Sequence, residues 1–228
     1  VDRIVAEAAD AASARLIRAR DEVDVRTEMR EGHAWIDLQT PSATYSNVRL
    51  GLAGRHQIEN AIVAVRLLET LPETTTLQVP PAAIRVALED VVWPARLEMR
   101  RLDDIDGLDV LIDGAHNAAG ARALAAHVSD TFGRPLPFVV GLMADKDADA
   151  ILGALAPVAS AFFCTAADTP RAAAPAHVAA VAARVAPTIE THVAANPIAA
   201  LRDAAAIGRP VVVAGSLYLA GEVRRRTS

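Results

Sequence analysis

Short apolar runs alternate with longer amphipathic stretches through the second half of the chain. Strands are expected at 108–112, 137–142, 161–165, 188–193 and 210–214, and helices from about 117, at 148–155, 176–185 and 198–206, and after Ser216. Buried strands separated by helices of this length are typical of βαβ units. The pattern therefore predicts an α/β fold, with a Rossmann-like domain built on a mostly parallel sheet.

The first half of the chain has a different pattern. An Ala-rich segment with helical spacing, 1–20, predicts a helix, and strands are expected at 33–38 and 45–52. In the second strand Tyr45, Asn47 and Arg49 alternate with Ser46, Val48 and Leu50, as in a half-buried strand. Gly54 precedes an amphipathic helix, and a Pro/Thr-rich linker at 71–81 leads to a short helix at 82–90.

Polar residues gather where the apolar strands of the second half end. They occupy 113–117, 143–147, 166–171 and 215–218. Ligands of parallel sheets bind at the carboxyl ends of the strands, so these segments are the expected site.

Composition narrows the functional classes. The chain of 228 residues is 52% hydrophobic and 22% charged, which predicts a folded protein, and its net charge of −5 argues against nucleic-acid binding. The one cysteine, Cys164, is expected to be a buried thiol and excludes a disulfide framework. No apolar run reaches the roughly 20 residues of a membrane span. We expect a cytoplasmic monomer with no membrane or nucleic-acid partner.

Lysine is nearly absent, because Lys146 is the only lysine and the other basic residues are arginine. A phosphate loop ending in Gly-Lys-Ser/Thr therefore does not occur in this chain. Lys146 lies between Asp145 and Asp147, which is compatible with a solvated charge run. An ammonium group that arginine cannot replace is the functional alternative.

Each of the other motifs has two readings. Asp113 can accept hydrogen bonds from a ribose or only form a turn. His116 and Asn117 lie where the amides of a helix N-terminus favour an anion, and the alternative is that Asn117 only caps the helix. The polar turn 54–61 can contact a nucleobase or cap its helix. Arg96 can reach a phosphate or pair with Glu98. Ser216 can bind a carboxylate or only cap the last helix, and Arg224–Arg226 is expected to be a frayed, solvated end.

The order of the motifs is more specific than any one of them. In chain order they are Gly-x-His-Gln-x-x-Asn-Ala (54–61), Trp-Pro-x-Arg-Leu-Glu (93–98), Asp-Gly-Ala-His-Asn (113–117), Asp-Lys-Asp (145–147), Thr-x-x-x-x-Pro-Arg-Ala (165–172) and Gly-Ser-Leu-Tyr (215–218). This set resembles the folylpolyglutamate synthase/dihydrofolate synthase family of the Mur ligase superfamily. The resemblance extends from about residue 45 to the C-terminus.

The resemblance implies that 1–78 is the C-terminal part of a central ATP-binding domain. Residues 79–228 would be the linker and the glutamate-binding C-terminal domain. The family's phosphate loop and Mg²⁺ ligands are expected in a missing upstream segment, so this chain alone is expected to be inactive. Two departures concern backbone shape, since the family commonly has Gly where Ala95 stands and Pro where Ala118 stands.

The activity implied by the resemblance is ATP-dependent addition of L-glutamate to folate or dihydropteroate through an acyl phosphate. His56, Gln57 and Asn60 would line the adenine pocket, Arg96 would contact the phosphates and Asp113 the ribose. Glutamate would be placed by His116, Ser216 and Tyr218, with His116 and Lys146 as the catalytic residues. The resemblance also implies that the two domains close over a shared site. The alternatives are another Mur-type amino-acid ligase, acting on a peptidoglycan precursor, and a non-catalytic nucleotide- or glutamate-binding module.

Overall fold

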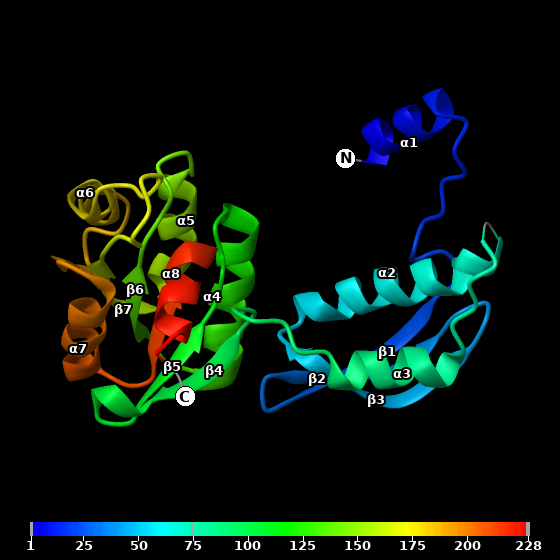
Figure 1. Ribbon diagram of the computed structural model, residues 1–228, viewed down its shortest axis with the longest axis horizontal. Helices are drawn as coiled ribbons and strands as arrows, with labels where there is room; N and C mark the ends of the chain where they lie inside the picture. The colour runs from blue at the N-terminus through cyan, green and yellow to red at the C-terminus, as the bar shows by residue number, and fades with distance from the viewer. Residues whose placement is uncertain (1, 74, 227–228) are drawn as a thin grey trace. The chain divides into compact units, whose positions relative to one another are not determined.

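The computed structural model describes residues 2–73 and 75–226, so Val1 of the expected first helix and Thr74 of the expected linker lie outside it. The chain forms two compact units (Figure 1). The first comprises residues 1–29, 34–51 and 56–91, and the second residues 30–33, 52–55 and 92–228.

The first unit combines a three-stranded sheet with helices. Across the sheet the strands follow the order β1 (Asp24–Arg30), β2 (His33–Gln39) and β3 (Thr44–Ala53); the helices are α1 (Asp2–Ala11), α2 (His56–Thr70), the 3-10 turn η1 (Leu71–Glu73) and α3 (Pro81–Asp90). Apolar residues of β2 and β3 pack on one face of α2 and on Ile84 of α3. This core is formed by Ala34, Ile36, Leu38, Tyr45, Val48, Leu50, Ala61, Ile62, Val65 and Ile84.

Three expectations for this unit are wrong. The first helix ends at Ala11 rather than near residue 20, and Ser13 just beyond it takes a left-handed φ of 51° that a helix cannot continue. Strand β1 was not expected, because its sequence is mainly polar and mostly exposed. Tyr45 is buried on the same side as Val48 and Leu50, because Asn47 adopts a φ of 53° and shifts the alternation by one residue.

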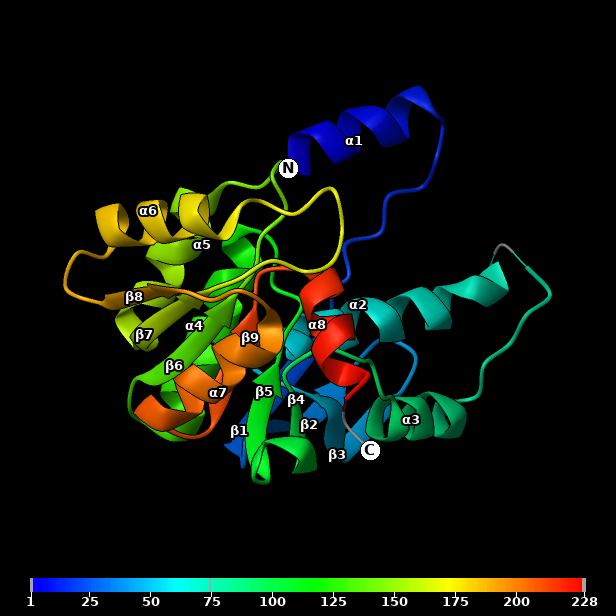
Figure 2. The same cartoon turned by 60° about the vertical axis from the view of Figure 1, so that its left-hand side comes forward.

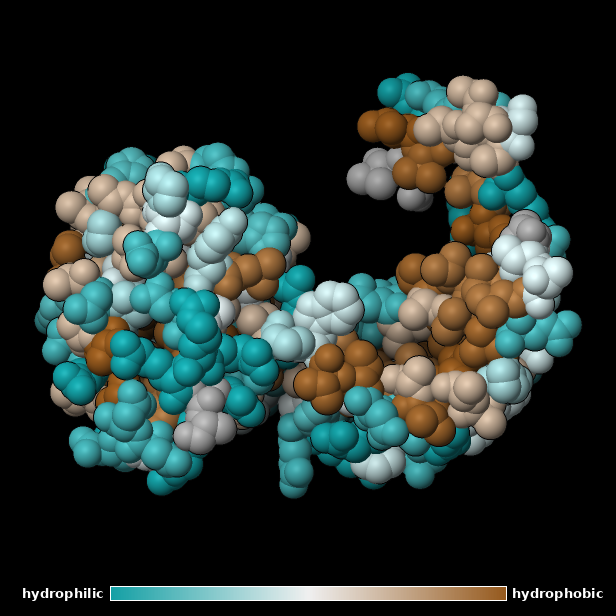
Figure 3. All heavy atoms as spheres, viewed as in Figure 1, coloured by the Kyte–Doolittle hydropathy of each residue, from teal (hydrophilic) through white to brown (hydrophobic). Residues whose placement is uncertain are grey.

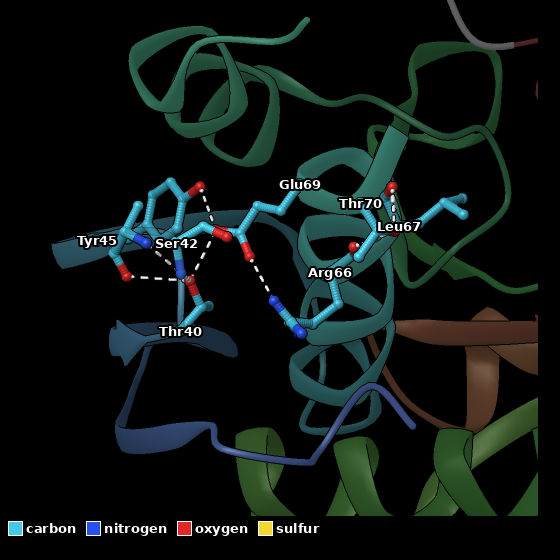
Figure 4. Close-up of polar contacts among 8 residues, drawn as sticks. Thr40, Ser42, Tyr45, Arg66, Leu67, Glu69 and Thr70 are labelled. Carbon is cyan, nitrogen blue, oxygen red and sulfur yellow. Dashed lines mark hydrogen bonds and ion pairs between the residues drawn. The ribbon is translucent and has the colours of Figure 1, made fainter. Parts of the chain in front are cut away.

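A partly buried polar cluster joins α2 to the sheet (Figure 4). Glu69 Oε1 accepts hydrogen bonds from Thr40 Oγ1 at 2.7 Å and from the Tyr45 hydroxyl at 3.0 Å, while Oε2 pairs with Arg66 at 3.0 Å. Burial, reinforced by the bond to Glu69, raises the pKa of the Tyr45 hydroxyl. Tyr45 therefore remains a protonated donor, and the buried Glu69 carboxylate is paired rather than left alone.

The second unit is a six-stranded α/β sheet. Its strand order is β4-β5-β9-β6-β7-β8, and all neighbouring pairs are parallel except the antiparallel pair β4–β5. The strands are β4 (Glu98–Leu102), β5 (Leu108–Ile112), β6 (Leu136–Val140), β7 (Ala159–Cys164), β8 (Glu190–Val193) and β9 (Val211–Ala214). The predicted mostly parallel α/β fold is confirmed.

Helices cover both faces of this sheet. They are α4 (Ala118–Phe132), α5 (Ala148–Leu155), α6 (Pro175–Val185), α7 (Pro197–Ile207) and α8 (Leu217–Arg224), with 3-10 turns η2 (Asp103–Ile105) and η3 (Ala156–Val158). Phe138 and Phe162 face a core shared with α4, α5 and α6, whereas Val139 and Phe163 face one shared with α7 and α8. Figure 2 shows α7 and α8 on the near side of the sheet. Cys164 is fully buried and free, as expected.

The crossover from β5 to β6 passes over β9, which is the last strand in the chain but lies between them. Helix α4 follows β5 on one face of the sheet, and α8 follows β9 on the other. Ligands of doubly wound sheets bind where neighbouring strands send their connections to opposite faces. The topology thus singles out the carboxyl ends of β5 and β9.

Gly215 is required where β9 meets the end of β6. Its φ is 111°, and a Cβ there would lie 2.7 Å from the Gly141 carbonyl oxygen. We expect Gly215→Ala to lower the free energy of unfolding of the second unit by about 2 kcal/mol or more. The control is Gly153→Ala within α5, where a Cβ meets no atom within 4 Å, and which should stabilise by up to about 1 kcal/mol. Urea denaturation followed by circular dichroism measures both; equal stabilities would contradict the prediction.

Candidate functional site

The segments after β5, β9 and β6 approach one another closely. The Asp113 N–H donates to Val213 O at 2.9 Å, and the Gly141 N–H donates to Ala214 O at 3.2 Å, which keeps the three strand ends aligned. Next to them, a Cβ on Gly114 would lie 2.3 Å from the Leu217 side chain. The fold therefore brings the predicted motifs 113–117 and 215–218 side by side.

Asp113 is a buried carboxylate whose two oxygens both accept backbone hydrogen bonds. Oδ2 accepts the Leu97 N–H at 2.9 Å, and Oδ1 accepts the Ala115 N–H at 2.8 Å. Burial raises the pKa of Asp113, and these two bonds together with the charges of Arg96 and His116 partly oppose the rise. The primary geometric role of Asp113 is thus to tie the segment before β4 to the end of β5. The ribose contact stays a prediction.

Arg96 lies on a sharp turn immediately before β4. Its neighbours Ala95 and Leu97 both have left-handed φ values, 56° and 49°, and the Ala95 carbonyl accepts the Gly114 N–H at 2.8 Å. Among residues 2–73 and 75–226 Arg96 makes no ion pair, so the alternative of an ion pair with Glu98 is not what the structure shows. The half-buried guanidinium lies close enough to Asp113 to favour its ionised form.

Glu98 instead pairs with Arg224 at the end of α8. The Arg224 Nε lies 2.9 Å from Glu98 Oε2, and the Arg100 Nε lies 3.4 Å from Oε1. Arg224 is therefore an anchored residue, and the expectation of a frayed end is wrong for it, because a carboxylate of β4 is within reach. Sequence spacing could not reveal this pair, since 126 positions separate the two residues.

His116 follows the strand end with a defined ring orientation. Its Nδ1 lies 2.8 Å from the Gly114 carbonyl oxygen, which can only accept, so Nδ1 carries the proton. In the neutral ring Nε2 is then a hydrogen-bond acceptor. Asn117 caps α4 by accepting the Gly120 N–H at 2.9 Å, as the interpretation of this residue as a helix cap predicts.

Ser216 and Tyr218 begin α8. Ser216 is 2% exposed and its Oγ accepts the Leu219 N–H at 3.1 Å, which makes it the helix cap. Tyr218 is half exposed in the first turn. A hydroxyl that already accepts a backbone bond still has its proton to donate, so the cap is compatible with binding an anion.

Lys146 lies in the segment after β6. Its Nζ is 2.9 Å from Asp145 Oδ2, and the hydrogen bond to Lys146 is the main reason that the pKa of Asp145 is lowered. Arg171 approaches the same carboxylate at 3.5 Å. The side chain of Lys146 is 31% exposed, so its ammonium group remains accessible to a second anion. Asp147 is the cap of α5, accepting the Ala150 N–H at 3.0 Å.

The remaining predicted residues belong to α2 in the first unit. Asn60 Nδ2 donates to Gln57 Oε1 at 2.9 Å, and Gln57 Nε2 lies 2.9 Å from His56 Nε2. Gln57 is buried, whereas Asn60 is exposed. The chain Asn60–Gln57–His56 orients the exposed amide of Asn60 at the start of the helix.

Metal-ligating clusters do not occur in the part of the chain that the structure describes, where no three His, Cys, Asp or Glu residues could hold an ion together. Within those same residues, no helix has both the length and the apolar character that a membrane span needs.

Comparison with known proteins places this geometry in a family. The family model described as "Dihydrofolate synthetase, C-terminal domain" matches residues 96–226. The dihydrofolate synthase/folylpolyglutamate synthase of Mycobacterium tuberculosis is 36% identical over 150 residues, covering 65% of this chain and 30% of that protein. The folylpolyglutamate synthase of Lacticaseibacillus casei is 30% identical over 198 residues, covering 85% of this chain and 44% of that protein.

A solved structure extends the similarity over nearly the whole chain. The M. tuberculosis folylpolyglutamate synthase, complexed with ADP and AMPPCP, superposes with a TM-score of 0.86 at 31% identity. The match covers 98% of this chain and 52% of that one. The chain thus spans about half the length, or less, of these relatives.

The acceptor role of Asp113 can be tested with Asp113→Asn. An amide keeps one acceptor oxygen and replaces the other with a donor, so one of the N–H groups of Leu97 and Ala115 loses its partner. We expect a loss of about 1–3 kcal/mol in unfolding free energy and faster hydrogen exchange at that amide. Asp109→Asn, which changes an exposed carboxylate of β5, the strand that Asp113 follows, is the control. Unchanged exchange at both Leu97 and Ala115 would rule out this role.

Proposed function

The chain belongs to the dihydrofolate synthase/folylpolyglutamate synthase family, and from this premise we propose that it is part of an ATP-dependent ligase that adds L-glutamate to folate or dihydropteroate. The observation that carries the proposal is the convergence of Asp113, His116 and Ser216 at the carboxyl edge of the sheet. These residues lie within the segment that matches the family model.

The proposed reaction joins two anions in two steps. ATP, when bound, supplies the phosphoryl group that turns the acceptor carboxylate into an acyl phosphate, with release of ADP. The amine of glutamate then attacks the acyl carbon, and the resulting tetrahedral intermediate expels inorganic phosphate. The task of the protein is to hold negatively charged reactants within reach of one another and to keep water away.

We propose that Arg96 and Asp113 serve the nucleotide, Arg96 through its phosphates and Asp113 through its ribose. The guanidinium of Arg96 is not engaged in an ion pair with any described residue, which leaves its donors available for phosphate. Asp113 uses one acceptor site of each oxygen for the backbone, and a carboxylate has further lone pairs for a hydroxyl. On α2, the oriented amide of Asn60, with Gln57 and His56 behind it, fits the edge of an adenine.

Glutamate would be placed by His116, Ser216 and Tyr218, with His116 and Lys146 as catalytic residues. With Nδ1 protonated, the Nε2 of His116 can accept a proton from the ammonium group of glutamate, which leaves the amine that attacks the acyl carbon. The hydroxyl of Ser216 lies at the amino end of α8, where the helix dipole favours a carboxylate. The ammonium of Lys146 can offset charge on the carboxylate or on the transferring phosphate.

We further propose that residues 1–78 are the C-terminal part of the ATP-binding domain and that 79–228 are the linker and the glutamate-binding domain. The match of the family model to 96–226 supports the second assignment. Helix α3 falls in the proposed linker and packs through Ile84 into the first unit. We assign no Mg²⁺ ligand to the described residues and expect those ligands in the half of the enzyme that this chain does not match.

Exposed apolar residues support the view that the first unit is an incomplete domain. Figure 3 shows apolar side chains gathered over α2. Val63 is 55% exposed and Leu67 62%, and Ile4 on α1 is 67% exposed. Apolar surface of this kind marks an interface. We propose that this surface packs against the unmatched half of the enzyme. We also propose that the enzyme works in the cytoplasm.

The proposal predicts that residues 1–228 alone do not turn over ATP, L-glutamate and a folate acceptor. A chimera in which this chain replaces the matched half of the M. tuberculosis folylpolyglutamate synthase should restore ligation. The measurement is glutamate-dependent ADP release, confirmed by mass of the product. A correctly folded chimera that binds nucleotide and never ligates glutamate would contradict the proposed function.

In the active enzyme, His116→Ala and Ser216→Ala are expected to raise the KM for glutamate or lower kcat, by about tenfold or more each. Asp203→Asn, at an exposed position of α7, is the control and should keep wild-type kinetics. Steady-state rates at varied glutamate measure both constants. Wild-type values in both variants would remove these residues from the glutamate site.

A further inference from the structure

Residues 94–97 form a turn whose shape is unfavourable in isolation. Ala95 and Leu97 carry side chains and yet adopt left-handed φ values of 56° and 49°, on either side of Arg96. Residues other than glycine avoid this region because Cβ crowds the backbone. Contacts from outside the turn must therefore hold it, and through it the direction of Arg96.

Glu98 supplies one of these contacts. Its Oε2 accepts the Ala95 N–H at 2.8 Å, and its side chain is only 15% exposed. Arg224 on α8 approaches both carboxylate oxygens, at 3.0 Å from Oε1 and 2.9 Å from Oε2. Glu98 is thus held between the turn and the end of α8, and its charge is paired rather than directed at a ligand.

The register of the sheet explains why this turn lies at the ligand-binding edge. Strand β4 is antiparallel to β5 and pairs Glu98 with Ile112, so the start of β4 lies beside the end of β5. There Asp113 accepts the Leu97 N–H at 2.9 Å. Carboxylates at 98 and 113 consequently fix the backbone N–H groups on both sides of Arg96.

We propose that Glu98 is a positioning residue. Its carboxylate holds the turn so that Arg96 points at the phosphates of the nucleotide. Its ion pair with Arg224 connects the turn to α8. The inference rests on the proposed function in so far as the anion is ATP. Neither the Trp-Pro-x-Arg-Leu-Glu motif nor an ion pair between Arg96 and Glu98 would give Glu98 this role.

A purely structural role for Glu98 makes a different prediction. A pair that merely docks α8 against β4 would lower stability and affect both substrates alike when it is removed. A positioning role should act on the nucleotide through Arg96 alone. Kinetics with each substrate varied, in the wild-type and in an Arg96→Ala background, separates the two.

In the complete enzyme, Glu98→Ala is expected to raise the KM for ATP about tenfold, because a displaced cation loses most of its contact with phosphate. The KM for glutamate should stay within about twofold of wild type, because the substitution changes only the turn that carries Arg96. Glu98→Gln retains an acceptor oxygen for the Ala95 N–H and should recover part of the loss. Asp203→Asn is the matched control, since it changes an exposed carboxylate of α7.

In the Arg96→Ala background, Glu98→Ala should have no further effect on the KM for ATP, because the two substitutions then remove the same interaction. An equal rise in both KM values, an unchanged KM for ATP, or a full effect of Glu98→Ala without Arg96 would each overturn the proposal.

Hydrogen exchange at single amides tests the same inference without relying on activity. In residues 1–228, Glu98→Ala should speed exchange of the Ala95 N–H at least about tenfold and leave Val139 in β6 unchanged, since only the turn loses an acceptor. Unchanged exchange at Ala95 would overturn the positioning role even if the enzyme is a ligase. Faster exchange at Ala95, together with a complete enzyme that neither binds ATP nor ligates glutamate, would instead keep the role and reject ATP as the anion.

Discussion

A buried carboxylate at the end of β5 is the constraint on which the geometry of this edge of the sheet depends. Asp113 is 5% exposed, and an ionised group that is removed from water needs hydrogen-bond donors around it. The donors are the N–H groups of Leu97 and Ala115. One bond fixes the start of β4, and the other fixes the turn that leads to His116 and α4. The charge that makes Asp113 costly to bury therefore also determines the geometry around it.

Most of the second unit could be predicted from the sequence because its pattern of apolar and polar residues is local and periodic. Strand β5 and helix α5 have the expected bounds, since buried apolar runs and amphipathic stretches follow directly from residue spacing. Strand β4 was missed because its sequence, Glu-Met-Arg-Arg-Leu, is mainly charged and it is a strand only through its pairing with β5. Strand β1 of the first unit was missed in the same way, because its sequence is also mainly polar.

The placement of the candidate residues was easier to predict than their hydrogen-bond and ion-pair partners. The motifs follow strands, and the sheet topology brings Asp113, His116 and Ser216 to one edge. The backbone contact of Asp113 with Leu97 joins residues 16 apart, and the pair Glu98–Arg224 joins residues 126 apart. Neither follows from spacing, because each depends on how the strands are ordered in the sheet.

The two departures that the resemblance implies, Ala95 and Ala118, fall where glycine and proline would suit the backbone best. Ala95 has a φ of 56°, a conformation that glycine adopts freely and that costs alanine about 1–2 kcal/mol. Ala118 is the first residue of α4, where proline is favoured because its N–H is not needed. In this chain, side-chain hydrogen bonds must stabilise backbone conformations that glycine and proline favour by themselves. Asn117 caps α4, while Glu98 and Asp113 hold the turn. Because alanine lacks the conformational freedom of glycine, the turn around Arg96 depends more on these two carboxylates than it would with Gly at position 95.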